Sequence, residues 1–429
     1  MKIGIRREDK SKWEARIPLV PTDMAALQRD HDLEFLVQPS DQRAYRAEEF
    51  TSAGIQVTED LSACPVILGV KEIPTTRFEP GKTYVFFSHT IKGQPYNMAM
   101  LRRLMNLGCN LIDYERILND VGQRVVFFGV HAGLAGMLDT LWAFGQRLQK
   151  RGIESPLGDL KQALGYRSLS EAENHLRAIG DRCRDTESLA SLGPVIVGIT
   201  GAGRVSQGAQ QICDLLKPET LKVSELSDIS ELTDGEFYKV VFEERDMVVR
   251  KDRGDFDLEE YYTSPHLYES CFAQYLPKLS MLVNCIYWEE KYPRLVTKRD
   301  LADLYLQPQP KLEAIGDISC DIEGSIEATV RPTDPGNPVY VYDVDKGLAR
   351  DGFEGKGPVI MAVDILPTEL PRDASEAFSA ALRSLIPGFA TADASSTFEK
   401  WDLPTPLKRA VILHKGKLTP DYAYMSEFL

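Results

Sequence analysis

The stretch VIVGITGAGRVSQGAQ, residues 195–210, carries the strongest signal for the fold. Residues 195–200 are mostly apolar and β-branched, a composition typical of a buried strand. Gly201 and Gly203 favour a sharp turn, and the residues that follow fit the start of a helix. A strand, a glycine turn and a helix in this order predict a site for the pyrophosphate of a dinucleotide, because free N–H groups at a helix start attract negative charge.

The spacing of these glycines is irregular. The third glycine is Gly208, whereas Ser206 occupies the position that a regular fingerprint gives to glycine. A plain tight turn is therefore an alternative to a cofactor site. Because the motif lies between a strand and a helix, we favour dinucleotide binding and predict these contacts: Gly201, Gly203, Arg204, Val205 and Gly208.

A residue that selects the cofactor is harder to place. The acidic residue expected about 20 positions later, for the adenosine ribose, has no clear candidate, since Glu225 and Asp228 lie in a polar loop. If the stretch KVVFEERD (239–246) is the neighbouring strand, its end carries Glu243, Glu244 and Arg245. Arg245 would then favour the 2′-phosphate of NADP over NAD, although solvated charge is the plain alternative for each of these residues.

Apolar runs rich in β-branched residues alternate with longer amphipathic stretches, which predicts an α/β fold with parallel sheets. A chain of 429 residues exceeds what one core usually serves, so we expect two domains. A long helical pattern from about Val130, which stops at Gly152, is expected to bridge them. Near the carboxyl end, DASEAFSAALRSLI (373–386) fits a helix capped by Asp373 or Ser375.

The composition excludes several classes of protein. The net charge of −14 opposes binding to nucleic acid or to anionic membranes. No run approaches the ~20 apolar residues of a membrane helix, and the amino terminus lacks the apolar core of a signal peptide. The seven cysteines form no CxxC pair, so we predict neither a disulfide framework nor a metal site. These features predict a cytoplasmic enzyme that acts on small molecules, with its oligomeric state left open.

Three apolar runs end in polar or charged side chains: VILGVKEIP (66–74), YVFFSHT (84–90) and LIDYERI (111–117). Because the carboxyl ends of parallel strands lie at one edge of a sheet, we expect Lys71, His89 and Glu115 to lie close together. The plain alternatives are solvated loop residues for the lysine and the glutamate, and a hydrogen-bonded structural group for the histidine. The coincidence of three such strand ends favours a functional site.

Two further motifs have simple structural interpretations beside functional ones. WEARIPL (13–19) contributes Glu14 and Arg16, which fit either a ligand clamp or a surface ion pair. AGLAG (132–136) places small residues on the long helical pattern, where close packing against another helix is the simplest interpretation.

These and other segments follow one another in a fixed order: IGIRREDKSKWEARIPLVP (3–21), ILGVKEIP (67–74), KTYVFFSHTIKGQP (82–95), LIDYERI (111–117), TGAGRVSQGAQ (200–210), VNCIYWEEKYPRLVT (283–297) and GDISCDIEGSIE (316–327). Together they resemble the lysine–2-oxoglutarate reductase family, also named lysine-forming saccharopine dehydrogenase. The similarity is to the reductase half of the bifunctional lysine-degrading enzyme, and alanine dehydrogenase is a more distant relative. The sequence ends at Leu429 without the second half of that enzyme, so we expect a separate enzyme to process the product.

The resemblance implies two Rossmann-like domains with an active-site cleft between them. In this plan the substrate domain comes from both chain ends, here residues 1–130 and 360–429. Connecting helices occupy residues 131–194, and the dinucleotide-binding domain occupies residues 195–359.

The resemblance also implies roles for individual residues. The matching residues are Lys71 and His89 for acid–base chemistry, Arg16 and Arg124 for the carboxylates of 2-oxoglutarate, and Glu14, Glu72 and Glu115 around the bound lysine. Lys71 would need its pKa lowered by burial and by neighbouring arginines. Fungal relatives can bridge a cysteine of the nucleotide loop to one in the motif NCIY, but Val205 occupies the loop position here and leaves Cys285 without that partner.

The reaction implied is the condensation of L-lysine with 2-oxoglutarate, followed by reduction of the imine with NADPH to saccharopine. It is reversible and would be the first step of lysine degradation, with NAD(H) as the alternative cofactor. One alternative keeps the fold and aminates a smaller 2-oxo acid with ammonia, as alanine dehydrogenase does. Another is a non-catalytic relative that binds NADP(H) and a partner protein.

Overall fold

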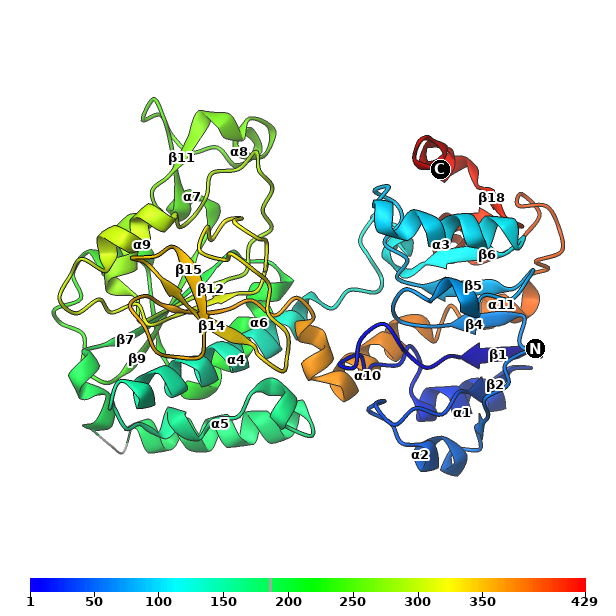
Figure 1. Cartoon of the computed structure of the whole chain (residues 1–429), viewed down its shortest axis with the longest axis horizontal. Helices are drawn as coiled ribbons and strands as arrows, with labels where there is room; N and C mark the ends of the chain where they lie inside the picture. Colours follow the sequence, from blue (N-terminus) through cyan, green and yellow to red (C-terminus); the bar gives the residue numbers. More distant parts are fainter. Residues whose placement is uncertain (185–186) are drawn as a thin grey trace. The chain divides into compact units, whose positions relative to one another are not determined.

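Two separate β-sheets organise the chain into two units (Figure 1) in the computed structural model, which describes residues 1–184 and 187–429. Unit 1 comprises Met1–Phe127 and Pro371–Leu429, and unit 2 comprises Phe128–Leu370. The sequence placed the changes of domain after residue 130 and at residue 360, so the observed boundaries differ by three residues at the first point and by eleven at the second. Each unit contains a largely parallel sheet flanked by helices, which confirms the predicted α/β class.

The sheet of unit 1 has eight strands in the order β18-β17-β6-β5-β4-β1-β2-β3. Strands β1 to β6 pair in parallel, while β17 and β18 form an antiparallel edge. The central strands are almost completely buried, which explains their largely apolar sequences. The strands are Lys2–Ile5 (β1), Glu34–Val37 (β2), Gln56–Val57 (β3), Val66–Leu68 (β4), Thr83–Phe86 (β5), Asn110–Asp113 (β6), Val411–His414 (β17) and Lys417–Leu418 (β18).

The helices of unit 1 are Pro21–Asp30 (α1), Ala47–Ser52 (α2), Pro95–Asn106 (α3), Pro371–Leu382 (α10), Pro387–Thr391 (α11) and Thr405–Arg409 (α12). The predicted capping of α10 by Asp373 or Ser375 is wrong, because the helix already begins at Pro371 and a proline suits a helix start. The Ser375 hydroxyl instead accepts the N–H of Ile17 at 3.0 Å, and Ser379 accepts that of Val20 at 3.0 Å. Helix α10 therefore fixes the segment that follows β1.

The sheet of unit 2 also has eight strands, in the order β15-β14-β16-β13-β12-β7-β9-β8. All neighbours pair in parallel except at β14, which pairs antiparallel with both β15 and β16. A separate two-stranded sheet pairs β10 with β11. The strands are Val195–Thr200 (β7), Glu219–Leu221 (β8), Phe237–Phe242 (β9), Val248–Arg250 (β10), Tyr268–Ser270 (β11), Met281–Asn284 (β12), Ala314–Asp317 (β13), Val339–Asp343 (β14), Leu348–Asp351 (β15) and Val359–Met361 (β16).

Alternate residues of β7 belong to two different cores. Val195, Val197 and Ile199 pack with residues of helices α4, α5 and α6, whereas Ile196 packs with residues of α9. Figure 1 shows α4 and α5 along one side of this sheet. Helices α4 and α5, in the segment 131–194 that we expected to connect the domains, thus cover a face of the unit 2 sheet. The helices are Gly129–Lys150 (α4), Leu169–Arg184 (α5), Arg204–Cys213 (α6), Glu244–Met247 (α7), Leu258–Thr263 (α8) and Lys298–Leu304 (α9).

Helices α4 and α6 approach each other closely because glycines lie at their contact. A Cβ atom at Gly133 would lie 1.9 Å from the carbonyl oxygen of Val205, and one at Gly208 would lie 2.1 Å from that of Val130. Both distances are far below van der Waals contact. The AGLAG motif therefore serves the helix packing that the sequence indicated.

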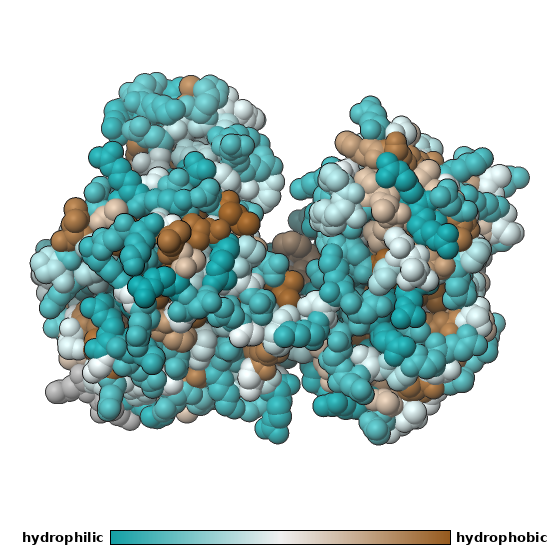
Figure 2. Space-filling model, in the orientation of Figure 1, coloured by the Kyte–Doolittle hydropathy of each residue, from teal (hydrophilic) through white to brown (hydrophobic). Residues whose placement is uncertain are grey.

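The surface in the view of Figure 2 is mostly hydrophilic, with scattered small apolar areas. Within residues 1–184 and 187–429, no helix is long and apolar enough to span a membrane. The seven cysteines all lie in this part of the chain, and each is free.

A pair of carboxyl groups lies buried where α4 meets the short helix Leu366–Glu369 (η10). The side chains of Asp139 and Glu369 are inaccessible to solvent and hydrogen-bond to each other. Asp139 also accepts the N–H of Ala163 at 2.7 Å. Burial raises the pKa of Asp139 to about 6, and burial together with the Asp139 charge raises the pKa of Glu369 well above its usual range. The pair therefore holds a proton that the unfolded chain would release.

We expect Asp139→Asn to stabilise the protein at alkaline pH. A carboxyl group whose pKa is higher in the folded state than in the unfolded state binds more protons when folded. The free energy of unfolding therefore falls as the pH rises from about 4, near the pKa in the unfolded state, through the pKa in the folded state. The variant keeps a hydrogen-bond partner for Glu369 but loses this charge. Its melting temperature should exceed that of the wild type by about 3 °C at pH 8, and the difference should shrink at pH 5. The control Asp255→Asn, at an exposed site, should show neither effect, and a difference independent of pH would contradict this account.

Candidate active site

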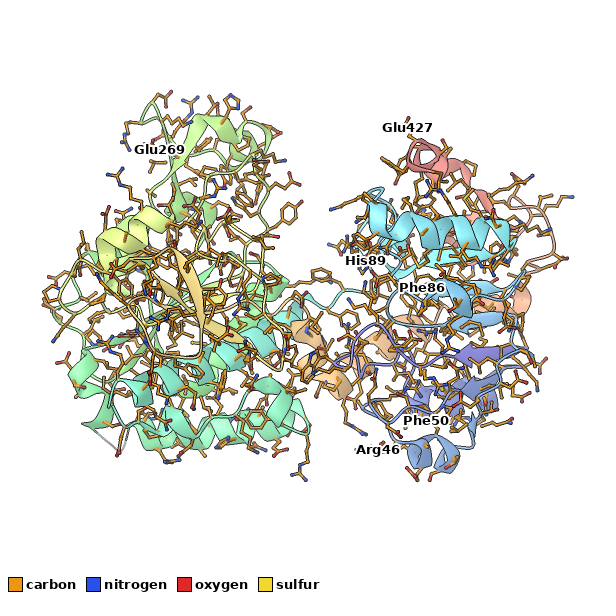
Figure 3. All side chains as sticks on the ribbon, in the orientation of Figure 1. Arg46, Phe50, Phe86, His89, Glu269 and Glu427 are labelled. Atoms are coloured by element: carbon orange, nitrogen blue, oxygen red, sulfur yellow. The ribbon has the colours of Figure 1, made fainter. Side chains whose placement is uncertain are left out.

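The carboxyl edge of the unit 1 sheet collects the residues that the sequence singled out. Strands β4, β5 and β6 are parallel neighbours, so the segments that follow them begin at the same edge. Lys71 follows β4, His89 follows β5 and Glu115 follows β6. In Figure 3, Phe86 marks the end of β5, and His89 lies beyond it at this edge.

A carboxylate links the histidine to this edge. The Nδ1 atom of His89 lies 2.8 Å from Oε1 of Glu72, and the ammonium of Lys10 lies 2.7 Å from the same oxygen. Burial would raise the pKa of Glu72, but the hydrogen bonds from His89 and Lys10 hold it at about 2. Because a carboxylate only accepts hydrogen bonds, Nδ1 carries the proton and Nε2 remains for proton exchange with a substrate.

Lys71 lies in a strongly charged environment. Its side chain is partly buried, and burial together with the charge of Arg16 lowers its pKa, against the opposing effects of Glu14 and Glu72. Within residues 1–184 and 187–429, its ammonium makes no ion pair within 4.0 Å. A lysine of this kind can lose its proton more readily than an exposed one and can serve as a base.

Glu14 and Arg16 form a buried pair rather than a surface one. The Nε atom of Arg16 donates to Glu14 Oε1 at 2.8 Å, and Nη2 donates to Oε2 at 2.6 Å. Burial would raise the pKa of Glu14, but Arg16 and Lys71 lower it below its usual value. The pair therefore stays ionised beside Lys71.

Glu115 and Arg124 pair with each other at a more exposed position. Nη2 of Arg124 donates to Glu115 Oε1 at 2.7 Å, and the arginine side chain is 44% exposed. In the described part of the chain neither side chain forms an ion pair with Lys71, Glu72 or His89. The structure thus brings together Lys71, Glu72, His89, Glu14 and Arg16, and it leaves the Glu115–Arg124 pair as a separate contact at the same edge.

The glycine motif lies at the carboxyl edge of the other sheet. Gly201 follows β7 directly with a φ of +79°, a conformation that favours glycine. A Cβ atom at Gly203 would meet no heavy atom within 4 Å, and Gly203 provides no side-chain cap for α6. The first N–H groups of α6 therefore have no side-chain cap from Gly203, and the turn beside them borders open space.

The predicted contacts in this motif have different surroundings. Arg204 is exposed at the start of α6, whereas Val205 is half-buried and packs with α4. Gly208 lies against α4, so the structure gives it a packing position and not one beside the turn. Among the predicted residues of the motif, Gly201, Gly203 and Arg204 are thus the ones that lie at the turn between β7 and α6.

The neighbouring strand that the sequence left open is β9. It pairs with β7 along its whole length, and the N–H of Gly201 donates to the carbonyl of Phe242, its last residue, at 2.8 Å. Glu243 follows directly and forms an ion pair of 3.2 Å with Arg245. Glu225 and Asp228 follow the edge strand β8 instead. The spacing of about 20 residues expected for the acidic residue does not apply here, because residues 214–236 separate α6 from β9.

A buried polar network beside the glycine motif escaped the sequence analysis. Asn284, which ends β12, accepts the hydroxyl of Thr200 at 2.9 Å and donates to Asp317 at 2.8 Å. Asp317 ends β13 and also accepts the hydroxyl of Ser319 at 2.7 Å. The sequence signal for this network was a polar residue at the end of each of two apolar strands. The contact of Lys10 with Glu72 had no such signal in the sequence.

Comparison with known proteins agrees with this geometry. The family description "Alanine dehydrogenase/PNT, N-terminal domain" matches residues 4–135. The solved L-alanine dehydrogenase superposes over the whole of both chains with a TM-score of 0.64 at 16% identity. The transhydrogenase from Sinorhizobium meliloti covers 98% of this chain and 100% of its own, with a TM-score of 0.54 at 13% identity. The fold is therefore that of alanine dehydrogenase.

Curated relatives define the group more narrowly. Mitochondrial alpha-aminoadipic semialdehyde synthase of Rattus norvegicus is 35% identical over 99% of this chain and 47% of its own length. The Arabidopsis thaliana protein is 36% identical over 99% and 41%. The NAD(+)-dependent, L-lysine-forming saccharopine dehydrogenase of Emericella nidulans is 28% identical over 89% and 90%. The chain is a homologue of these proteins, which confirms the resemblance, and it spans about half the length of the semialdehyde synthases.

We expect the glycines of the motif to separate into two roles on substitution. Gly203→Ala should leave the melting temperature unchanged, because its Cβ atom meets open space, yet weaken NADPH binding at least tenfold by blocking the approach of the pyrophosphate. Gly208→Ala should cost about 1–3 kcal/mol of stability through overpacking against α4. Thermal melts and fluorescence titration with NADPH would measure both. Equal effects of the two variants on stability would contradict the assignment.

Proposed function

We propose that this protein condenses L-lysine with 2-oxoglutarate and reduces the resulting imine with NADPH to saccharopine. It would be an oxidoreductase that acts on CH–NH bonds, reversibly, in lysine degradation. The group formed by Lys71, Glu72 and His89, beside the Glu14–Arg16 pair, supports this proposal most strongly. The names of the curated relatives, semialdehyde synthases and lysine-forming saccharopine dehydrogenases, support the choice of substrates.

The proposed reaction needs groups that move protons. The ε-amine of the substrate lysine must lose a proton before it attacks the ketone, and the carbinolamine must then lose water. Lys71, with its lowered pKa, can accept the first proton. His89, held through Nδ1 by Glu72, can exchange a proton at Nε2 during loss of water. The reduced cofactor, when bound at the glycine motif, supplies the hydride for the imine carbon.

The proposed reaction also needs fixed charges around a dicarboxylate and an ammonium. Arg16 and Arg124 offer planar forks that suit the carboxylates of 2-oxoglutarate. Each is paired with a glutamate here, Arg16 with Glu14 and Arg124 with Glu115. These glutamates can take up the ammonium of lysine when the arginines bind the keto acid. The alternating charges thus match a substrate pair of opposite charge.

The cofactor choice rests on two opposed groups at the end of β9. Glu243 suits a ribose hydroxyl, as in NAD(H), whereas Arg245 suits the 2′-phosphate of NADP(H). The fungal relatives have NAD(+) in their names. We propose NADP(H), because Arg245 can release Glu243 to bind a phosphate at an exposed position, where its side chain is 69% accessible.

Location remains a prediction. The sequence predicts a cytoplasmic protein, whereas the names of the mammalian relatives describe mitochondrial proteins. Small molecules, namely lysine, 2-oxoglutarate and saccharopine, are the proposed binding partners.

We expect absorbance at 340 nm to fall only when NADPH, lysine and 2-oxoglutarate are present together. Lys71→Met and His89→Gln should each lower kcat at least 100-fold, the usual range for loss of an acid–base group, with little change in NADPH affinity. Lys92→Met, an exposed lysine near the same strand end, is the control and should keep full activity. Activity with ammonia in place of lysine would support the amination of a smaller oxo acid. NADPH binding without any turnover would support the non-catalytic alternative.

We expect Arg245→Ala to raise KM for NADPH about tenfold and to leave KM for NADH unchanged, because only NADPH carries the phosphate; this factor corresponds to ~1.4 kcal/mol. Glu243→Gln should have the opposite effect and weaken the binding of NADH relative to that of NADPH. Arg253→Ala, at another exposed position of unit 2, is the matched control. If Arg245→Ala affects both cofactors equally, the arginine does not select the phosphate.

A further inference from the structure

Two buried carboxylates beneath the carboxyl edge of the unit 1 sheet bind main-chain amides. Glu8 is 7% exposed. Its Oε1 atom accepts the N–H of Val70 at 2.8 Å, and its Oε2 atom accepts the N–H of Lys71 at 2.9 Å. The Glu8 side chain therefore reaches from the end of β1 across to the segment after β4, and it binds both amides with separate oxygens.

Asp113 likewise accepts main-chain N–H groups from the segments that follow β5 and β6. It is the last residue of β6 and is inaccessible to solvent. Its Oδ2 atom accepts the N–H of Ser88 at 3.1 Å and also the Ser88 hydroxyl. Its Oδ1 atom accepts the N–H of Glu115 at 2.8 Å. One carboxylate thus joins the residue before His89 to the segment that carries Glu115.

The surroundings of Glu8 leave little room for movement. A Cβ atom at Gly69 would lie 3.5 Å from Glu8 Oε1 and 3.2 Å from a side-chain carbon of Arg6. The guanidinium of Arg6, also buried, lies 3.8 Å from Glu8 Oε2. The carboxylate of Glu8 is therefore enclosed by the Arg6 side chain and by the main chain at Gly69.

The main chain at His89 also needs support. Its φ of +49° is uncommon for a residue with a side chain, and such conformations cost about 1–3 kcal/mol unless their surroundings hold them. The bonds of Asp113 to Ser88 hold one side of it, and the side-chain amide of Asn97 donates to the His89 carbonyl at 3.1 Å.

We propose that Glu8 and Asp113 are positioning residues for the reaction, Glu8 for Lys71 and Asp113 for His89 and Glu115. The inference rests on the proposed function and extends it to residues that touch no substrate. Each carboxylate fixes the main chain from which a reacting side chain extends. A displacement of about 1 Å in a reacting group can cost 100-fold in rate, so such anchoring affects turnover more than binding.

The test compares Glu8→Gln with Glu49→Gln. Glutamine keeps one acceptor oxygen but presents an NH₂ group to the second amide, so one of the two bonds is lost. Glu49 is the matched control because its carboxylate also accepts a main-chain N–H, that of Arg46 at 2.7 Å, and binds Arg372, away from the candidate site. Asp113→Asn is the second variant, should Glu8→Gln fail to fold.

We expect Glu8→Gln and Asp113→Asn to lower kcat about 10- to 100-fold, with KM for NADPH within twofold of the wild type. Glu49→Gln should keep its kcat even if its melting temperature falls as far. Equal kcat values for Glu8→Gln and the control would overturn the proposal while the proposed function stands. Amide hydrogen exchange gives an independent readout: Val70 and Lys71 should exchange faster in Glu8→Gln than in wild type. If the wild type lacks lysine-dependent activity, the proposed function fails. If amide exchange at Val70 and Lys71 is also the same in Glu8→Gln as in the wild type, Glu8 does not anchor this segment.

Discussion

The parallel, in-register pairing of four strands in unit 1 is the constraint on which the candidate site depends. Ile5 of β1 pairs with Leu68 of β4, Leu68 with Val85 of β5, and Phe86 with Asp113 of β6. Because parallel neighbours end at one edge, four segments distant in sequence begin next to one another. A shift of register by one residue would turn each side chain to the other face and would separate the polar groups.

Charges at this edge are tolerated because most of them have partners. Burial of a charge is costly unless it is paired and hydrogen-bonded. Arg16 and Glu14 satisfy each other, and Glu72 binds His89 and Lys10. Lys71 differs, since burial and Arg16 lower its pKa. The same pairing that stabilises the edge thus leaves one amine more ready than usual to release its proton.

In unit 2 the position of the glycine turn depends on helix packing. Gly133 and Gly208 let α4 and α6 approach until main-chain atoms nearly touch. This contact fixes α6, and the hydrogen bond from Gly201 to Phe242 fixes the turn against β9. The open space at Gly203 then lies at a defined place relative to β9, the strand that Glu243 follows. The irregular glycine spacing thus has a structural explanation in close helix packing.

The sequence by itself determined the α/β class, the strand–turn–helix unit and the polar strand ends at Lys71, His89 and Glu115, because these follow from local periodicity and from residues adjacent in the chain. Only the tertiary structure decided which groups bind one another: that Glu72 holds His89 and that Glu8 holds the amide of Lys71. It also decided that the carboxyl-terminal helix α10 supports the segment after β1. Such partners lie far apart along the chain, and strand order, register and side-chain direction bring them together, none of which a local pattern encodes.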